Sequence, residues 1–111
     1  MDAGATTTGA RAALHDRVKR GTLMGLPGRG VTWFPIWQFD LAGRRARPVV
    51  AELLRVFRGV DRPLAPIEIA SWAQVPQAEL DDVAPADWVA DGRPDEAVVT
   101  SARHSAGRLA A

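Results

Sequence analysis

The side chains that most often do chemistry in proteins are scarce in this sequence. There are two histidines, His15 and His104, and no cysteine. The sequence pattern places each histidine on the solvent-facing side of a helix, without the further histidine or cysteine that a metal site requires. A general base is the alternative role for either histidine, and a solvated surface side chain is strongly favoured. We therefore predict no metal site and no catalytic residue.

The other patterns that approach a catalytic or ligand-binding motif are incomplete. Asp81-Asp82 is an acidic pair without the third, regularly spaced ligand of a calcium loop. None of the serines at 71, 101 and 105 stands in the Gly-x-Ser-x-Gly elbow of a hydrolase. Segment 25–30, Gly-Leu-Pro-Gly-Arg-Gly, lacks the Gly-Lys-Ser/Thr of a phosphate loop, so a hairpin turn is favoured over a nucleotide site. We expect that the chain is not an enzyme and binds no cofactor.

Length and composition limit the scaffold that carries any site. The 111 residues suffice for one compact domain with a core of its own. The absence of cysteine excludes disulfides and agrees with a reducing compartment. The sequence has no long uncharged apolar run and no basic, apolar leader, so we expect a cytoplasmic protein without a membrane partner.

Charge is divided unevenly along the chain. Residues 1–62 contain eleven basic and five acidic side chains, a net charge of +6, whereas residues 63–111 contain three and eight, a net charge of −5. Such asymmetry indicates either that the two halves bind different partners, or that the charged surfaces pair with each other or with a second subunit. Both a homodimer and a hetero-oligomer agree with this pattern.

The elements that position these charges begin with an N-terminal arm. Residues 1–8 are small and polar and are expected to be disordered. Residues 9–40 predict a short amphipathic helix over 10–20 and then a hairpin, with strands near 23–26 and 31–34. Four aromatic side chains at the end of this segment are expected to join the hairpin to the core: Trp33, Phe34, Trp37 and Phe39.

The basic residues of the arm are arranged like the last helix and the wing of a DNA-binding protein. Each of these side chains is suited to neutralising a phosphate: Arg17, Lys19, Arg20 and Arg29. A recognition helix needs preceding helices to brace it, and the residues before position 10 are too few to form them. We expect at most weak, sequence-independent DNA binding, and a small DNA-binding regulator is the alternative function.

Residues 41–111 predict a series of short helices, so the expected fold class is mainly α-helical with one short β-hairpin. Pro48, Pro66 and Pro85 each suit the first position of a helix. The most regular apolar face follows the first of them, at Val50, Leu53, Leu54 and Phe57. The last helix starts near residue 95, after a turn at Gly92. Its apolar face is predicted to contain Val98, Ala102 and Leu109.

Two segments carry a recognisable pattern of residue types. The first is the aromatic entry Phe-Pro-Ile-Trp-Gln-Phe at 34–39. The second contains Ala-Ser-Trp at 70–72, then Pro76, Leu80 and the stretch from Pro85 through Val89 to Gly92. Together they resemble the MbcA/ParS/Xre antitoxin family, over about residues 20–108. The family's complete N-terminal helix-turn-helix is missing, and Asp82 replaces a small residue or glycine, which we expect to alter that turn.

The resemblance implies a function and a partner. An antitoxin of this family binds a RES-domain toxin, an enzyme that consumes NAD, and occludes its active-site entrance. Residues 41–111 form the toxin-binding domain in this interpretation. Carboxylates suit a pocket lined with arginine for phosphate-bearing ligands. The implied toxin-binding residues are Asp87, Trp88, Asp91, Gly92, Arg93, Asp95 and Glu96.

Two alternatives for these residues stay open. Core packing is an alternative for Trp88, and helix capping or simple solvation is an alternative for the carboxylates. We also expect residues 22–76 to stay folded when the chain is cut after Gly92.

Overall fold

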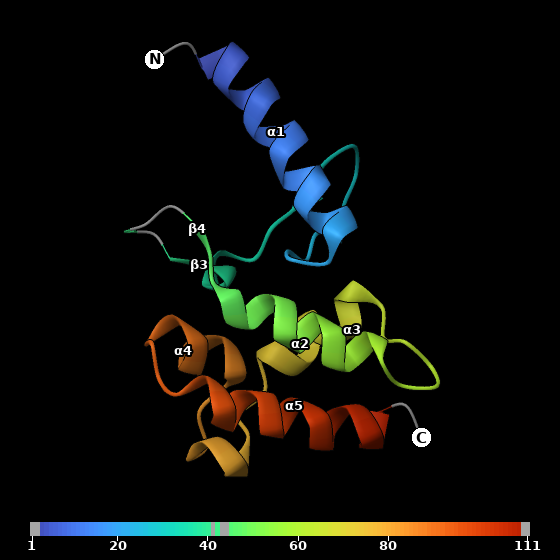
Figure 1. Ribbon diagram of the computed structural model, residues 1–111, viewed down its shortest axis with the longest axis vertical. Helices are drawn as coiled ribbons and strands as arrows, with labels where there is room; N and C mark the ends of the chain where they lie inside the picture. Colours follow the sequence, from blue (N-terminus) through green and yellow to red (C-terminus); the bar gives the residue numbers. More distant parts are fainter. Residues whose placement is uncertain (1–2, 41, 43–44, 110–111) are drawn as a thin grey trace.

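The computed structural model describes residues 3–40, 42 and 45–109 (Figure 1). These residues form α-helices, two 3-10 turns and two short antiparallel strand pairs, so the prediction of a mainly α-helical fold is confirmed. The order is α1 (Ala3–Arg20), β1 (Leu26–Pro27), β2 (Thr32–Trp33), η1 (Ile36–Gln38), β3 (Phe39–Asp40), β4 (Arg45–Ala46), α2 (Pro48–Arg58), α3 (Pro66–Ala73), η2 (Ala78–Leu80), α4 (Pro85–Ala90) and α5 (Asp95–Leu109).

Proline defines where three of the helices begin. Helices α2, α3 and α4 start at Pro48, Pro66 and Pro85 as predicted. The first helical position has no intrahelical acceptor for an N–H, so proline loses nothing there and its fixed φ favours the helix. Helix α4 ends before Gly92, whose φ of +71° permits the sharp turn into α5.

The core lies between α2 and α5, which pack side by side (Figure 1). The predicted face of α2 is confirmed, since Val50, Leu53, Leu54 and Phe57 are all buried. Val98 and Ala102 of α5 are buried as well, and Leu109 falls on the same face of the helix as predicted, but it is not buried. Leu109 is 45% exposed, because it is the last residue of α5 and lies at the edge of a surface groove.

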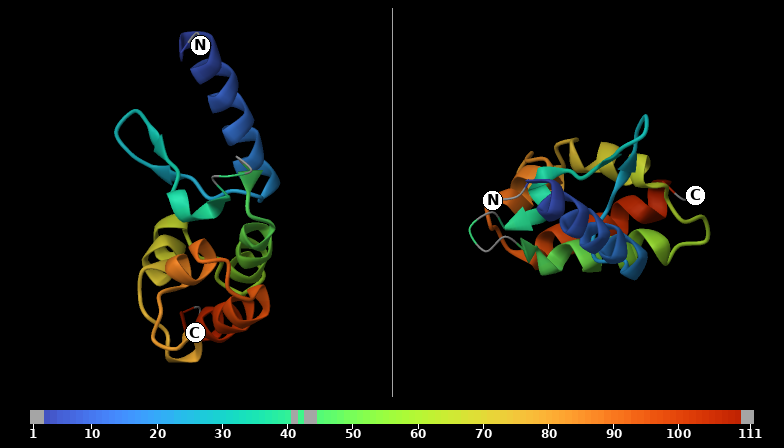
Figure 2. Two further views of the ribbon diagram at one scale, coloured as in Figure 1. Left: turned by 90° about the vertical axis from the view of Figure 1, so that its left-hand side faces the viewer. Right: turned by 90° about the horizontal axis from the view of Figure 1, so that it is seen from above.

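Helix α1 extends away from the body formed by α2 to α5 (Figures 1 and 2). It starts at Ala3, so residues 3–8 are helical where the sequence suggested disorder; residues 1–2 lie outside the described part. Once a helix has formed, each added residue costs little, and this segment contains no proline to stop it. The helix ends as predicted at Gly21, whose φ is +77°.

The predicted hairpin exists but is shorter than expected. Leu26 pairs with Trp33 and Pro27 with Thr32, and the Gly28 N–H donates to the Val31 carbonyl across the turn. The second strand stops before Pro35, because proline has no N–H for a further ladder bond. A second small antiparallel pair follows, in which Phe39 of β3 lies opposite Ala46 of β4 and Asp40 lies opposite Arg45.

The aromatic segment joins the hairpin to the body only in part. Trp37 is buried, Phe34 and Phe39 are half-buried, and Trp33 is 64% exposed, so its predicted place in the core is wrong. The hairpin stands off the body, and the indole of Trp33 lies over its own turn instead. A Cβ atom added to Gly28 would meet that ring at 2.5 Å.

Gln38, the polar residue of the aromatic entry at 34–39, bonds the segment after α1 to the core. It is fully buried, its Oε1 accepts from the Met24 N–H at 2.7 Å, and its Nε2 donates to the Met24 carbonyl at 2.9 Å. Leu23 and Met24 are buried beside it. These residues therefore connect the chain after α1 to the core. Across the described part of the chain, no helix has the length and apolar character needed to cross a membrane.

Candidate functional site

The implied toxin-binding residues meet at the corner between α4 and α5. The turn after α4 contains Asp91, Gly92 and Arg93, and α5 starts at Asp95. The indole Nε1 of Trp88 donates to the Pro94 carbonyl at 2.9 Å, and the Arg93 guanidinium lies 5.1 Å from the Trp88 ring centroid. Both contacts fix the turn against α4. The structure thus brings all these residues together on a defined corner.

Four carboxylates project from this corner: Asp87, Asp91, Asp95 and Glu96, all of them exposed. Asp91 is 3.8 Å from the Arg93 Nε, a solvent-exposed ion pair of little energetic weight. Asp95 and Glu96 lie in the first turn of α5, where the helix dipole favours negative charge. The concentration of exposed carboxylates makes the corner able to accept hydrogen bonds from cationic side chains.

Trp88 itself is in the core. Its side chain is buried and its only polar atom is bonded within the chain, which agrees with the packing role considered as an alternative. It supports the corner from below and is not exposed as an anchor for a partner. Of the implied toxin-binding residues, the exposed ones are therefore the four carboxylates, Gly92 and Arg93.

Hollows flank α4 on both sides of the carboxylates. One, of about 340 Å³, is lined by residues that include Arg45, Arg47, Gly92 and Asp95. The other, of about 500 Å³, is lined by residues that include Ile36, Trp37 and Asp87. Arg47 lies between them and donates to the Phe39 carbonyl at 3.2 Å and to the Ala90 carbonyl at 3.4 Å. Asp87 and Asp95 therefore each border a depression large enough to accept a side chain.

The residues considered for DNA binding lie on the arm. Lys19 and Arg20 are exposed and Arg17 is half-buried in the last turn of α1, and Arg29 is exposed at the hairpin turn. The Arg20 Nε is 3.1 Å from Asp16, one helical turn earlier. All four are on the part of the molecule that extends from the body (Figure 2).

The histidine and serine side chains, which could do chemistry, lie far from one another or are buried. His15 is exposed and its ring meets Phe34 edge-on, with centroids 6.3 Å apart. His104 bonds through Nδ1 to Glu79 on the surface. Ser101 and Ser105 are buried. Among the described residues, no group of three or more histidine, cysteine or acidic side chains is placed to hold a metal ion.

The turn at Asp81-Asp82 is left-handed at both residues. Their φ angles are 55° and 61°, values that glycine adopts readily and that aspartate tolerates better than most residues. Asp82 therefore occupies a backbone conformation that would suit glycine.

Compared with models of known protein families, with curated proteins and with solved structures, the chain shows no match.

Proposed function

We propose that the chain is an antitoxin of a type II toxin-antitoxin system that binds a RES-domain, NAD-consuming toxin in the cytoplasm. The observation that carries the proposal is the α4–α5 corner with its exposed carboxylates. Asp87, Asp91, Asp95 and Glu96 project from a turn that Trp88 holds in place. A fixed array of carboxylates needs no reordering when it meets a cationic surface, which favours binding.

In this proposal the chain acts by occlusion. The toxin's pocket for a phosphate-bearing ligand offers arginine side chains, and the carboxylates of the corner accept their hydrogen bonds in place of the ligand. The NAD chemistry belongs to the toxin, so the antitoxin supplies no catalytic residue and holds no cofactor. The depressions beside Asp87 and Asp95 receive side chains from the rim of that pocket.

Co-expression with a RES-domain toxin encoded beside the chain tests the proposal. We expect the chain to restore growth and NAD level and to purify with the toxin. A triple charge reversal at the corner should abolish protection: Asp91→Lys, Asp95→Lys and Glu96→Lys. A matched variant with the same change in net charge should protect like the wild type: Asp16→Lys, Glu52→Lys and Asp61→Lys.

Circular dichroism of each variant shows whether it is folded. Full protection by a well-folded corner variant would contradict the carboxylate mechanism. An intact chain that neither binds nor neutralises the adjacent toxin would contradict the antitoxin proposal as a whole.

A DNA-binding regulator is the second candidate, and the exposed basic side chains of the arm favour it. On this alternative, neutralising Arg17, Arg20 and Arg29 together weakens binding to duplex DNA, and affinity falls steeply as salt rises. A tight complex with one operator sequence, measured with the purified chain, would place this function first.

A further inference from the structure

The most exposed large apolar side chain in the described part of the molecule lies beside the carboxylate corner. Ile36, the first residue of η1, has 69% of its surface exposed. It lines the hollow of about 500 Å³ whose lining also contains Asp87 of α4. We call this the η1–α4 hollow. A single exposed isoleucine is ordinary, but one that shares a hollow with a carboxylate forms a surface of two chemical kinds.

The two sides of the η1–α4 hollow are held together within the chain. The 3-10 turn η1 packs against α4, and Trp37, next to Ile36, is buried. The Arg47 guanidinium donates to the carbonyls of Phe39 and Ala90, so it connects β3, which follows η1, to the end of α4. The hollow therefore exists before a partner arrives, and filling it requires little reordering of the chain.

Much of the lining of the hollow is carbon. The only polar atom of the Trp37 side chain, the indole Nε1, is inaccessible to solvent, so it offers no donor to an occupant. The part of this side chain that faces the hollow is therefore apolar, like the side chains of Ile36, Ala86 and Ala90 in the same lining. These groups suit the aliphatic part of an incoming side chain.

Asp87 is the charged group of the hollow that stays available to a partner. The lining contains three charged side chains, Asp40, Arg47 and Asp87, so its net charge is −1. Arg47 is bonded to backbone carbonyls, and the Asp40 Oδ1 accepts from the Ala42 N–H at 3.1 Å. Asp87 is exposed, and among the described residues none donates to its carboxylate. The hollow is therefore the complement of a side chain with one positive charge.

We propose that the η1–α4 hollow receives one arginine side chain of the toxin, with its aliphatic stem on Ile36 and Trp37 and its guanidinium on the Asp87 carboxylate. An arginine can bury its stem along an apolar surface while its head group pairs with a carboxylate. This inference rests on the proposed function. It extends the toxin-binding surface beyond the α4–α5 corner to Ile36, a residue of the segment before the helical domain.

Other side chains match the hollow less well. Leucine or phenylalanine would fill the apolar part, but it would remove water from Asp87 without replacing the lost hydrogen bonds. A carboxylate would be repelled by Asp40 and Asp87. Lysine has a stem and a charge, but its ammonium group is more strongly hydrated and does not form the paired hydrogen bonds that a guanidinium makes with a carboxylate. Arginine is therefore the occupant that satisfies both surfaces.

Two single variants test the two halves of the contact. Ile36→Ala removes the apolar wall and Asp87→Asn removes the charge, and both positions are exposed, so the fold should persist. Ile67→Ala and Asp61→Asn make the same changes at exposed positions outside the hollow. In calorimetric titrations with the toxin encoded beside the chain, we expect each hollow variant to bind about tenfold more weakly than the wild type, and each control to bind within about twofold of it.

The double variant Ile36→Ala/Asp87→Asn shows whether one toxin side chain contacts both residues. If one arginine bridges them, losing either contact weakens the other, so the double variant should lose less affinity than the product of the two single losses. Replacing the toxin's surface arginines by alanine, one at a time, should identify the occupant. That replacement should weaken binding to the wild type about tenfold and binding to the Asp87→Asn chain much less.

The outcomes separate this inference from the proposed function. Single losses that multiply in the double variant, or a toxin without an arginine of this behaviour, would overturn the inference. Hollow variants that bind like the wild type would overturn it as well. The proposed function would then stand alone if the charge reversal at Asp91, Asp95 and Glu96 still abolished binding. A toxin that does not bind the intact chain would overturn both.

Discussion

Gln38 shows how much a single side chain contributes to the attachment of the arm. Its amide satisfies both the N–H and the carbonyl of Met24 inside the core. Leucine has a similar size but no polar atoms, so Gln38→Leu leaves both groups of Met24 without partners. Each buried group without a partner costs about 1–3 kcal/mol, so for the two groups we expect a loss of about 2–6 kcal/mol in the free energy of unfolding.

Urea unfolding followed by circular dichroism measures this loss. Gln74→Leu is the control, because Gln74 is exposed and should tolerate the same change. Equal stabilities for the two variants would mean that the amide of Gln38 does not hold the arm.

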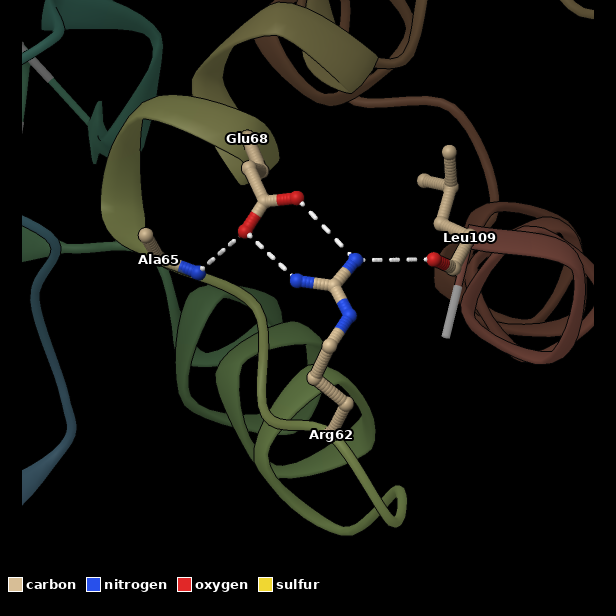
Figure 3. A network of polar contacts seen from close by, with 4 residues as sticks. All are labelled: Arg62, Ala65, Glu68 and Leu109. Carbon is tan, nitrogen blue, oxygen red and sulfur yellow. Dashed lines mark hydrogen bonds and ion pairs between the residues drawn. The ribbon is translucent and has the colours of Figure 1, made fainter. Parts of the chain in front are cut away.

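Glu68 makes the stability of the fold depend on pH. The hydrogen bond from the Ala65 N–H, and then the bonds and charge of Arg62, hold the pKa of Glu68 below its ordinary value of 4.5 (Figure 3). A carboxyl whose pKa is lowered on folding stabilises the fold above its unfolded pKa, and this contribution is lost as the pH falls through the folded pKa.

We therefore expect the melting temperature of the wild type to fall more steeply below pH 4.5 than that of Glu68→Gln. Added salt should reduce the difference, since the Arg62–Glu68 pair lies at the surface with 55% and 38% of the two side chains exposed. Parallel pH profiles for the two proteins would contradict the role assigned to Glu68.

At the scale of elements, the face of α2 is the most direct test of packing. Leu53 is buried in the core, whereas Arg55 is exposed on the other side of the same helix. Leu53→Ala should lower the free energy of unfolding by about 2–5 kcal/mol through the cavity it leaves. Arg55→Ala should change it by less than about 0.5 kcal/mol. Thermal unfolding of both variants measures the difference, and equal shifts would mean that the helix faces the other way.

Elements with a local signal were predictable. Proline at the first helical position placed the starts of α2, α3 and α4, and the spacing of Val50, Leu53 and Phe57 identified a buried face. These signals act within one or two helical turns. The exposure of Leu109 and Trp33 depends on which distant segments of the folded chain pack against them. No local pattern of residues contains that information.

At the scale of the molecule, α5 completes the core. Val98, Ala102 and Ala106 are buried, and α5 packs along α2. These contacts argue against the expectation that residues 22–76 stay folded after a cut behind Gly92, because the cut would expose the apolar face of α2. We predict that the truncated chain loses most of its helical circular dichroism and its cooperative thermal transition. A truncated chain with a cooperative transition would show that α5 is dispensable for the fold.

The candidate site was predictable to a similar extent. Sequence proximity alone groups Asp87 to Glu96 around one turn, and the structure adds the common exposure of the carboxylates and the role of Trp88 beneath them. The hollow lined by Trp72, Val75 and Leu109 was not predictable. Val75 and Leu109 are far apart in the sequence, and they meet only when α3 and α5 pack into the fold.

The packing of α2 against α5 also sets a delay during synthesis of the chain. Helix α2 ends at Arg58, and its partner begins only at Asp95. At about 5–20 residues per second, the ribosome needs roughly 2–7 s to add the segment between them. Throughout that interval α3 can cover Phe57 through Trp72, but the part of the α2 face that packs on α5 stays uncovered. The nascent chain thus exposes part of an apolar helix face until α5 has been made and can pack against it.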